Sequence, residues 1–200
     1  VERSRGLGDV YKRQTQYIVT GTDANGCSSS DTVNVFVNPL PAVDAGPASS
    51  ICLGDTAQLD ASGADSYSWS PSGSLSNATI STPLAFPTVN TTYTVVATDT
   101  NGCVNTDSVV VTINSLPTAS VSSDTTICVG DTASLVASGG TTYQWSPDST
   151  LSNAFIAAPS AFPTLSATYQ VIISDPNGCN DTAEVTVTIQ NLPTISAGVD

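Results

Sequence analysis

The stretch 93–113 combines two alternating apolar patterns with a turn between them. Val109, Val111 and Ile113 fall on one face of a strand, because side chains two residues apart point the same way. Asn101-Gly102 lies between the two segments, and Asn-Gly readily adopts the positive φ angles that a two-residue hairpin turn requires. The pattern therefore predicts a β-hairpin over 93–113.

The same hairpin pattern occurs three times with a 76-residue period. The copies cover 17–37, 93–113 and 169–189, and each has an Asn-Gly pair at its turn: Asn25-Gly26, Asn101-Gly102 and Asn177-Gly178. A Leu-Pro pair follows each copy, and proline ends a strand ladder because it lacks the N–H group. A fixed period of this kind indicates a repeat protein.

This period predicts five segments. Residues 1–14 match no position of the repeat and resemble translated sequencing-adapter read-through, so we interpret them as a non-native head. Residues 15–38 are expected to be the C-terminal hairpin of a truncated repeat. Two complete repeats follow, at 39–114 and 115–190, and residues 191–200 are expected to begin the next one.

No segment of 15–200 keeps a helical period, and each complete repeat shows about seven short strand patterns separated by turn residues. Strands at this spacing predict an all-β fold, in which each tandem 76-residue repeat forms an immunoglobulin-like antiparallel β-sandwich.

Four aromatic residues are expected in the cores of these sandwiches. Trp69 and Trp145 lie on the third predicted strand, and Tyr93 and Tyr169 begin the sixth. An alternative is that the two tryptophans are exposed and stack on sugar rings, but their alternation with other apolar residues favours the core.

Charge is distributed very unevenly along the chain, whose formal net charge is −13. All four basic residues lie within the first fourteen positions, and histidine is absent. Only Glu2 and Asp9 of the 17 acidic residues precede Thr15, so the segment 15–200 carries a formal charge of −15. Such a segment is not expected to bind nucleic acid or to insert directly into a membrane, because it offers neither cationic contacts nor a long apolar run.

Five cysteines recur at repeat-related positions. Cys27, Cys103 and Cys179 follow the Asn-Gly pairs, whereas Cys52 and Cys128 lie in the first turn of each complete repeat. Pairing within a repeat would give Cys52–Cys103 and Cys128–Cys179, leaving Cys27 unpaired by truncation. In an immunoglobulin-like sandwich, however, these two turns lie at opposite ends, which favours Cys52 with Cys179 across a joint. The sequence leaves both pairings open.

The combination of several motifs resembles a known family. The motifs are ICLGD and ICVGD, YSWSPSGSLSNA and YQWSPDSTLSNA, the two PT-to-TY stretches, and three copies of DxNGC. Together they are similar to the PKD-like or Ig-like repeats of large secreted surface proteins in Bacteroidota-type bacteria. The PKD signature WDFGDG is replaced by WSPSG and WSPDS. The resemblance implies tandem PKD-like sandwiches, an extracellular location, and an association with gliding motility and type IX secretion.

Candidate chemistry is sparse, and no catalytic or metal-binding residue is predicted. Histidine and a CxxC motif are absent, which argues against zinc, and serine or cysteine catalysis lacks an activating base. Repeated calcium sites are a weaker possibility, because few acidic positions recur between repeats. We therefore expect a non-catalytic spacer or stalk in adhesion or gliding, with neighbouring repeats, surface glycans or cell-surface proteins as partners. The alternative is a carbohydrate-binding or linker module of a secreted polysaccharide-degrading enzyme.

Overall fold

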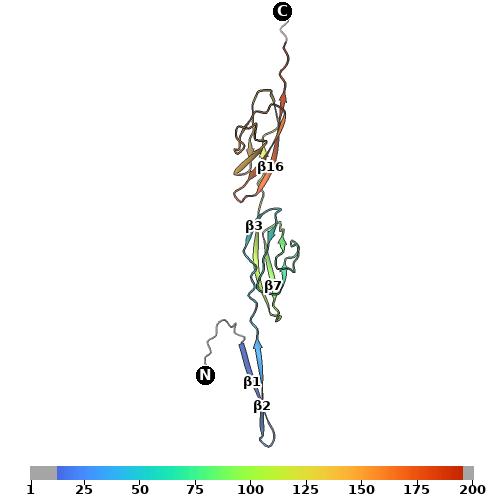
Figure 1. Ribbon diagram of the computed structural model, residues 1–200, viewed down its shortest axis with the longest axis vertical. Helices are drawn as coiled ribbons and strands as arrows, with labels where there is room; N and C mark the ends of the chain where they lie inside the picture. The colour runs from blue at the N-terminus through green and yellow to red at the C-terminus, as the bar shows by residue number, and fades with distance from the viewer. Residues whose placement is uncertain (1–12, 196–200) are drawn as a thin grey trace, which may run out of the picture. The chain divides into compact units, whose positions relative to one another are not determined.

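A computed structural model describes residues 13–195 of the chain (Figure 1). All regular elements in this part are strands: β1 Arg13–Thr22, β2 Ser28–Val37, β3 Ser49–Cys52, β4 Ala57–Gln58, β5 Ser66–Ser70, β6 Leu84–Ala85, β7 Thr91–Thr98, β8 Val104–Asn114, β9 Ser120–Val121, β10 Thr125–Cys128, β11 Ala133–Ser134, β12 Ala137–Ser138, β13 Thr142–Ser146, β14 Ser160–Ala161, β15 Ala167–Ser174 and β16 Asn180–Gln190. The described residues fall into two compact units. Unit 1 holds 13–49 and 56–112, and unit 2 holds 50–55 and 113–195.

Unit 2 consists of two layers of strands. One layer is a four-stranded sheet in the order β10-β16-β15-β13, and the other contains the short pairs β9 with β12 and β11 with β14. The pairs β13–β15 and β15–β16 are antiparallel, whereas β10 runs parallel to β16. The first two strands of the repeat therefore belong to different layers: β9 pairs with β12, whereas β10 is part of the four-stranded sheet. The parallel pair was not anticipated by the prediction of a purely antiparallel sandwich.

The core of unit 2 lies between these layers. Its buried side chains come from both of them: Ala133, Leu135 and Ala137 from one, and Trp145, Tyr169, Val171, Ile173, Val185 and Val187 from the other. The alternation of buried and exposed residues along β15 follows the period of two that the sequence showed. The fold is an immunoglobulin-like β-sandwich, which confirms the predicted fold class.

Unit 1 repeats this arrangement with equivalent residues. Strands β8, β7 and β5 are neighbours in one sheet, and β4 pairs with β6. Trp69 and Tyr93 are buried with Val95, Val109 and Val111. The indole N–H of Trp69 donates to the carbonyl of Ile80 at 3.0 Å, as that of Trp145 does to Ile156. Both tryptophans therefore fill the core with their one polar group satisfied.

Close packing of the first strand explains a glycine in each repeat. A Cβ atom built on Gly63 or Gly139 would lie 1.9 Å from the carbonyl oxygen of Ala42 or Thr118, respectively. Both glycines also have positive φ angles, 91° and 118°. Only glycine fits where the backbone of the second strand segment passes so close to the first.

Strands β1 and β2 form an antiparallel ribbon within unit 1 (Figure 1). In the register of this ribbon, Tyr17 pairs with Val33. Tyr17 is 58% exposed, whereas its equivalents Tyr93 and Tyr169 are fully buried. The ribbon therefore has the strands of the repeat's final hairpin without a second layer over them. Because β1 begins at Arg13, it includes the last two residues of the predicted head. Positions 1–12 of that head, and 196–200 of the predicted next repeat, lie outside the described residues.

The predicted two-residue hairpin turns are wrong. In each hairpin five residues connect the strands, from Asp99 to Cys103 in the middle copy. Gly102 has a positive φ of 78°, but no residue other than glycine has a positive φ in the described chain, so Asn101 does not adopt the conformation that a two-residue turn requires. The asparagine occupies a wider loop, which the preceding aspartate organises.

We expect Trp145→Ala to lower the free energy of unfolding of unit 2 by about 3–5 kcal/mol, because it leaves a cavity at the centre of the core. Chemical denaturation monitored by circular dichroism measures this change. The control is Phe155→Ala, whose side chain is 71% exposed, and for which a change within about 0.5 kcal/mol is expected. Equal effects of the two substitutions would contradict the assignment of Trp145 to the core.

Candidate functional site

Cys52 and Cys179 form a disulfide bond, with their Cα atoms 5.5 Å apart. Both belong to unit 2, although 127 positions separate them in the sequence and Cys52 belongs to the preceding predicted repeat. Cys179 is almost fully buried, at 1% exposure. Of the two pairings that the sequence left open, this is the one across repeats.

The first turn of the repeat presents Cys52. The backbone N–H of Asp55 donates to the carbonyl of Cys52 at 3.0 Å, which closes the turn around Gly54. Gly54 has a φ of 98°, a conformation that strongly favours glycine. The N–H of Leu53 donates to the carbonyl of Asn114 at 2.9 Å and fixes the position of the turn.

The hairpin loop presents Cys179 through the carboxylate of Asp175. Its Oδ1 atom accepts hydrogen bonds from the backbone N–H groups of Asn177, at 2.9 Å, and of Cys179, at 2.8 Å. The N–H of Gly178 donates to the carbonyl of Asp175 at 3.1 Å. Asp23 and Asp99 make the same two side-chain contacts in their loops. The DxNGC motif thus encodes a loop that holds its cysteine in one defined place.

These contacts also affect the ionisation of the loop aspartates. Desolvation acts to raise the pKa of Asp175, but the hydrogen bonds from Cys179, Asn177 and Gly178 together outweigh it and hold the pKa below its ordinary value. The pKa of Asp99 is lowered by the same balance of causes. The charged carboxylate is therefore the form that stabilises the loop.

The within-repeat pairing of Cys128 with Cys179 is not formed, and the length of β16 explains why. Cys128 pairs with Gln190 at the end of that strand, whereas Cys179 directly precedes its first residue, Asn180. Eleven residues of strand span about 33 Å, but the Cα atoms of a disulfide lie within about 7 Å. Cys103 and Cys128 are free, as is Cys27.

Two further carboxylates bind the first strand region, and the sequence reasoning missed them. Asp181 accepts from the N–H of Ala119 at 2.9 Å, and Asp107 accepts from that of Ala45 at 2.8 Å. The hydrogen bond from Ala119, then that from Thr182, lowers the pKa of Asp181. Asp107 and Asp181 do not align at the 76-residue spacing, so repeat comparison offered no signal for them.

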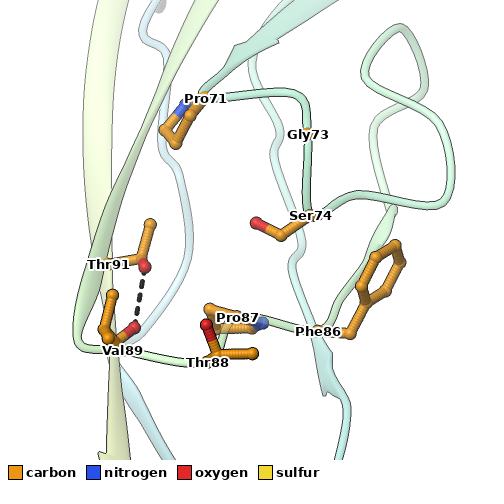
Figure 2. Close-up of a pocket in the computed structure, with 8 residues that line it drawn as sticks. All are labelled: Pro71, Gly73, Ser74, Phe86, Pro87, Thr88, Val89 and Thr91. Carbon is orange, nitrogen blue, oxygen red and sulfur yellow. Dashed lines mark hydrogen bonds between the residues drawn. The ribbon is translucent and has the colours of Figure 1, made fainter.

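Unit 1 has a shallow hollow of about 360 Å³ beside the loop that follows β5 (Figure 2). Two of its polar side chains, those of Ser74 and Thr91, already have partners. Ser74 shares a 2.6 Å hydrogen bond with the hydroxyl of Tyr93, and Thr91 donates to the carbonyl of Val89 at 2.8 Å. Phe86 lies at one end of the hollow and is 45% exposed. No charged side chain lines it, so the hollow has no group suited to acid–base chemistry.

The other predicted chemistries find little in the structure. Trp69 and Trp145 are each only 2% exposed, so neither ring is available to stack on a sugar. No group of three or more acidic, cysteine or histidine side chains in the described residues is arranged to hold a metal ion. Residues 13–195 also contain no helix of the length and hydropathy needed to cross a membrane.

No protein-family model matches the chain, and no curated protein matches it. Solved structures do resemble it. One is a bacterial protein described as a "Ca2+-stabilized adhesin" that "helps an Antarctic bacterium reach out and bind ice", with 14% identity over 90% of this chain and 58% of that one and a TM-score of 0.43. Another is the insect immune protein hemolin, with 13% identity over 88% and 56% of the two chains and a TM-score of 0.38.

A third is the Ig1-2 module of the Drosophila receptor protein tyrosine phosphatase DLAR, with 12% identity over 76% of this chain and all of that one and a TM-score of 0.30. These similarities concern the fold alone.

Loss of the disulfide should destabilise unit 2. We expect Cys52→Ser to lower the free energy of unfolding by about 2–5 kcal/mol, because the unfolded chain gains conformational entropy when the disulfide no longer closes a loop. Cys128→Ser is the matched control, since it changes the same position of the next repeat without breaking a bond. Denaturant unfolding under non-reducing conditions measures both, and equal stability of the two variants would refute a structural role for the bond.

The lowered pKa of Asp175 predicts a specific pH dependence. A carboxyl whose pKa is depressed in the folded state adds stability above its unfolded pKa, about 3.9, and loses that contribution as the pH falls through the folded pKa. Asp175→Asn should therefore melt at a lower temperature than the parent chain at pH 7, and the difference should shrink below about pH 4. Asp148→Asn removes an exposed loop carboxylate as the control, and its melting temperature at pH 7 should stay close to that of the parent chain. A constant offset for Asp175→Asn would contradict the assigned role of the charge.

Proposed function

We propose that this chain is a non-catalytic structural segment of a secreted cell-surface protein, in which successive sandwiches act as a spacer or stalk. The observation that carries the proposal is the Cys52–Cys179 bond, which connects positions of two successive repeats. A crosslink of this kind resists extension of the chain, which a spacer under load requires and which catalysis does not.

The covalent path explains how the bond would act mechanically. Tension applied to the two ends passes from Cys52 directly to Cys179, so the residues between them carry no load. These residues include most of both sandwiches. The bond thus shields the residues of this loop from the applied tension, whereas β16 and the residues after it stay in the load path.

The surface chemistry supports the same proposal. Residues 15–200 contain no lysine or arginine and carry a formal charge of −15, which keeps copies soluble and mutually repelling. Disulfides form and persist in oxidising compartments outside the cytosol, which supports an extracellular location. The sequence resemblance further suggests adhesion or gliding as the setting and type IX secretion as the route.

The alternative, a carbohydrate-binding or linker module of a secreted enzyme, has weaker support. With both tryptophans in the core, its remaining candidates are the exposed aromatic side chains of the described residues, which are Tyr17, Phe36, Phe86, Phe155 and Phe162. The hollow beside Phe86 offers no free charged group to hydrogen-bond a sugar. We therefore favour the structural role.

Single-molecule stretching tests the proposal. The oxidised chain should extend only through the residues outside the 52–179 loop, whereas the reduced chain should unfold stepwise and gain about 430 Å more contour length, at about 3.4 Å for each of 127 residues. Cys52→Ser should behave like the reduced chain under both conditions. Smooth extension of the reduced chain, with no stepwise unfolding, would overturn the proposed mechanical role.

A further inference from the structure

We propose that Cys128 and Cys103 each form a further disulfide of the same kind as Cys52–Cys179, and that the two bonds are different ones. Each would be closed by another repeat of this type. Cys128 would take the hairpin-loop cysteine of a repeat that follows, and Cys103 the first-turn cysteine of a repeat that precedes. The bonds would thus form a ladder in which every repeat is crosslinked to the next.

The first turn around Cys128 reproduces the turn around Cys52, its equivalent one repeat earlier. Asp131 N–H donates to the carbonyl of Cys128 at 3.1 Å, where the equivalent bond in the first copy measures 3.0 Å. Val129 N–H donates to Gln190 at 3.0 Å, as Leu53 does to Asn114 at 2.9 Å. Gly130 has a φ of 93°, against 98° for Gly54. Cys128 is thus presented as its bonded counterpart is.

The hairpin loop around Cys103 likewise reproduces the loop around Cys179. Asp99 Oδ1 accepts from the N–H groups of Asn101 and Cys103 at 2.9 and 2.8 Å, the same distances as in the bonded copy. What differs is the environment of the sulfur atom. Cys179 is buried against its partner, whereas Cys103 is partly exposed and Cys128 is exposed.

The partner of Cys128 has to come from another repeat. The hairpin-loop cysteine of its own repeat, Cys179, lies at the opposite end of β16 and is already bonded to Cys52. The bonded pair shows the required relation, which is a first-turn cysteine and the hairpin-loop cysteine 127 positions later. For Cys128 that position belongs to a further repeat.

Closure of such a bond requires an oxidant, and a small-molecule disulfide such as oxidised glutathione suffices. The Cys128 thiolate attacks it and forms a mixed disulfide, releasing one glutathione as a thiol. The thiolate of the hairpin-loop cysteine then attacks the Cys128 sulfur and releases the second glutathione. Two protein thiols are oxidised to one S–S bond, and the oxidant is reduced to two thiols.

A chain extended by one repeat tests the proposal. Residues 39–114 are appended after Gln190, with the copy of Cys52 in the added repeat replaced by serine. The original repeat carries Cys103→Ser. The 99–106 sequence then occurs twice in the extended chain, but only the copy in the added repeat contains a cysteine. The chain is refolded with oxidised and reduced glutathione, and its free thiols are counted under denaturing conditions.

The disulfides are then mapped by mass spectrometry after cleavage before aspartate. Trypsin is unsuitable because the chain has no lysine or arginine after Arg13. Cleavage before aspartate isolates each cysteine on its own peptide: 23–30, 44–54, 99–106, 124–130 and 175–180. We expect the 124–130 peptide to be linked to the 99–106 peptide of the added repeat. The Cys52–Cys179 bond should persist, leaving Cys27 as the one free thiol.

Controls separate this result from nonspecific oxidation. Cys128→Ser in the extended chain should leave the added hairpin-loop cysteine free and raise the thiol count to two. Cys27 lies in the same kind of loop and is exposed, so it reports random crosslinking. Three free thiols, or linkage of the added cysteine to Cys27 or Cys52, would overturn the proposal. Three free thiols or linkage to Cys27 would leave the stretching prediction for the existing bond intact, whereas linkage to Cys52 would remove that bond as well.

Discussion

Burial of one face of the final hairpin is the interaction on which each sandwich depends. Tyr169, Val171 and Ile173 alternate along β15, and all three are fully buried against the opposite layer. The β1–β2 ribbon shows the same sequence pattern without that layer, and Tyr17 and Val19 are then 58% and 69% exposed. The alternation therefore encodes a strand face that is complete only when the rest of a repeat covers it. The DxNGC loop joins the two strands of this hairpin, so packing of the hairpin on the core also determines the position of the loop cysteine.

The absence of cations after Arg13 determines how the chain accommodates its carboxylates. Without lysine, arginine or histidine, their partners have to be N–H and O–H donors, and backbone amides serve this purpose. Asp175 holds the hairpin loop in this way, and Asp181 attaches the first strand region to β16. A carboxylate that accepts hydrogen bonds from backbone N–H groups fixes the conformation of irregular segments, which have no hydrogen bonds from strand pairing. Acidic side chains thus stabilise local structure without ion pairs, and the chain can keep a uniformly negative surface.

The sequence predicted the parts of the fold that depend on local pattern. The period of two along 93–113, together with the 76-residue spacing, was sufficient to predict the all-β sandwich. The parallel pairing of β10 with β16 was missed, because a four-residue strand carries no signal of its direction. The turn at Asn101-Gly102 was predicted too short, because the dipeptide alone does not show that Asp99 widens the loop by accepting two N–H groups. Asp107 and Asp181 were missed because their contacts join residues 62 positions apart at non-equivalent positions of the repeat.

The spacing of the cysteines has a mechanical consequence that neither sandwich has alone. In an array closed at every repeat, the next first-turn cysteine would lie one repeat after Cys128, and therefore only a short segment after Cys179. Tension would cross from Cys52 to Cys179, follow that segment, and cross the next bond. Two repeats would then contribute only about 85 Å of extensible chain, against about 520 Å for the same residues without bonds, at about 3.4 Å per residue. Bonds confined to single repeats would leave every joint extensible. Linking successive repeats makes the loops overlap. The 52–179 loop encloses the joint at 114–117, whereas the short segment after Cys179 remains in the load path.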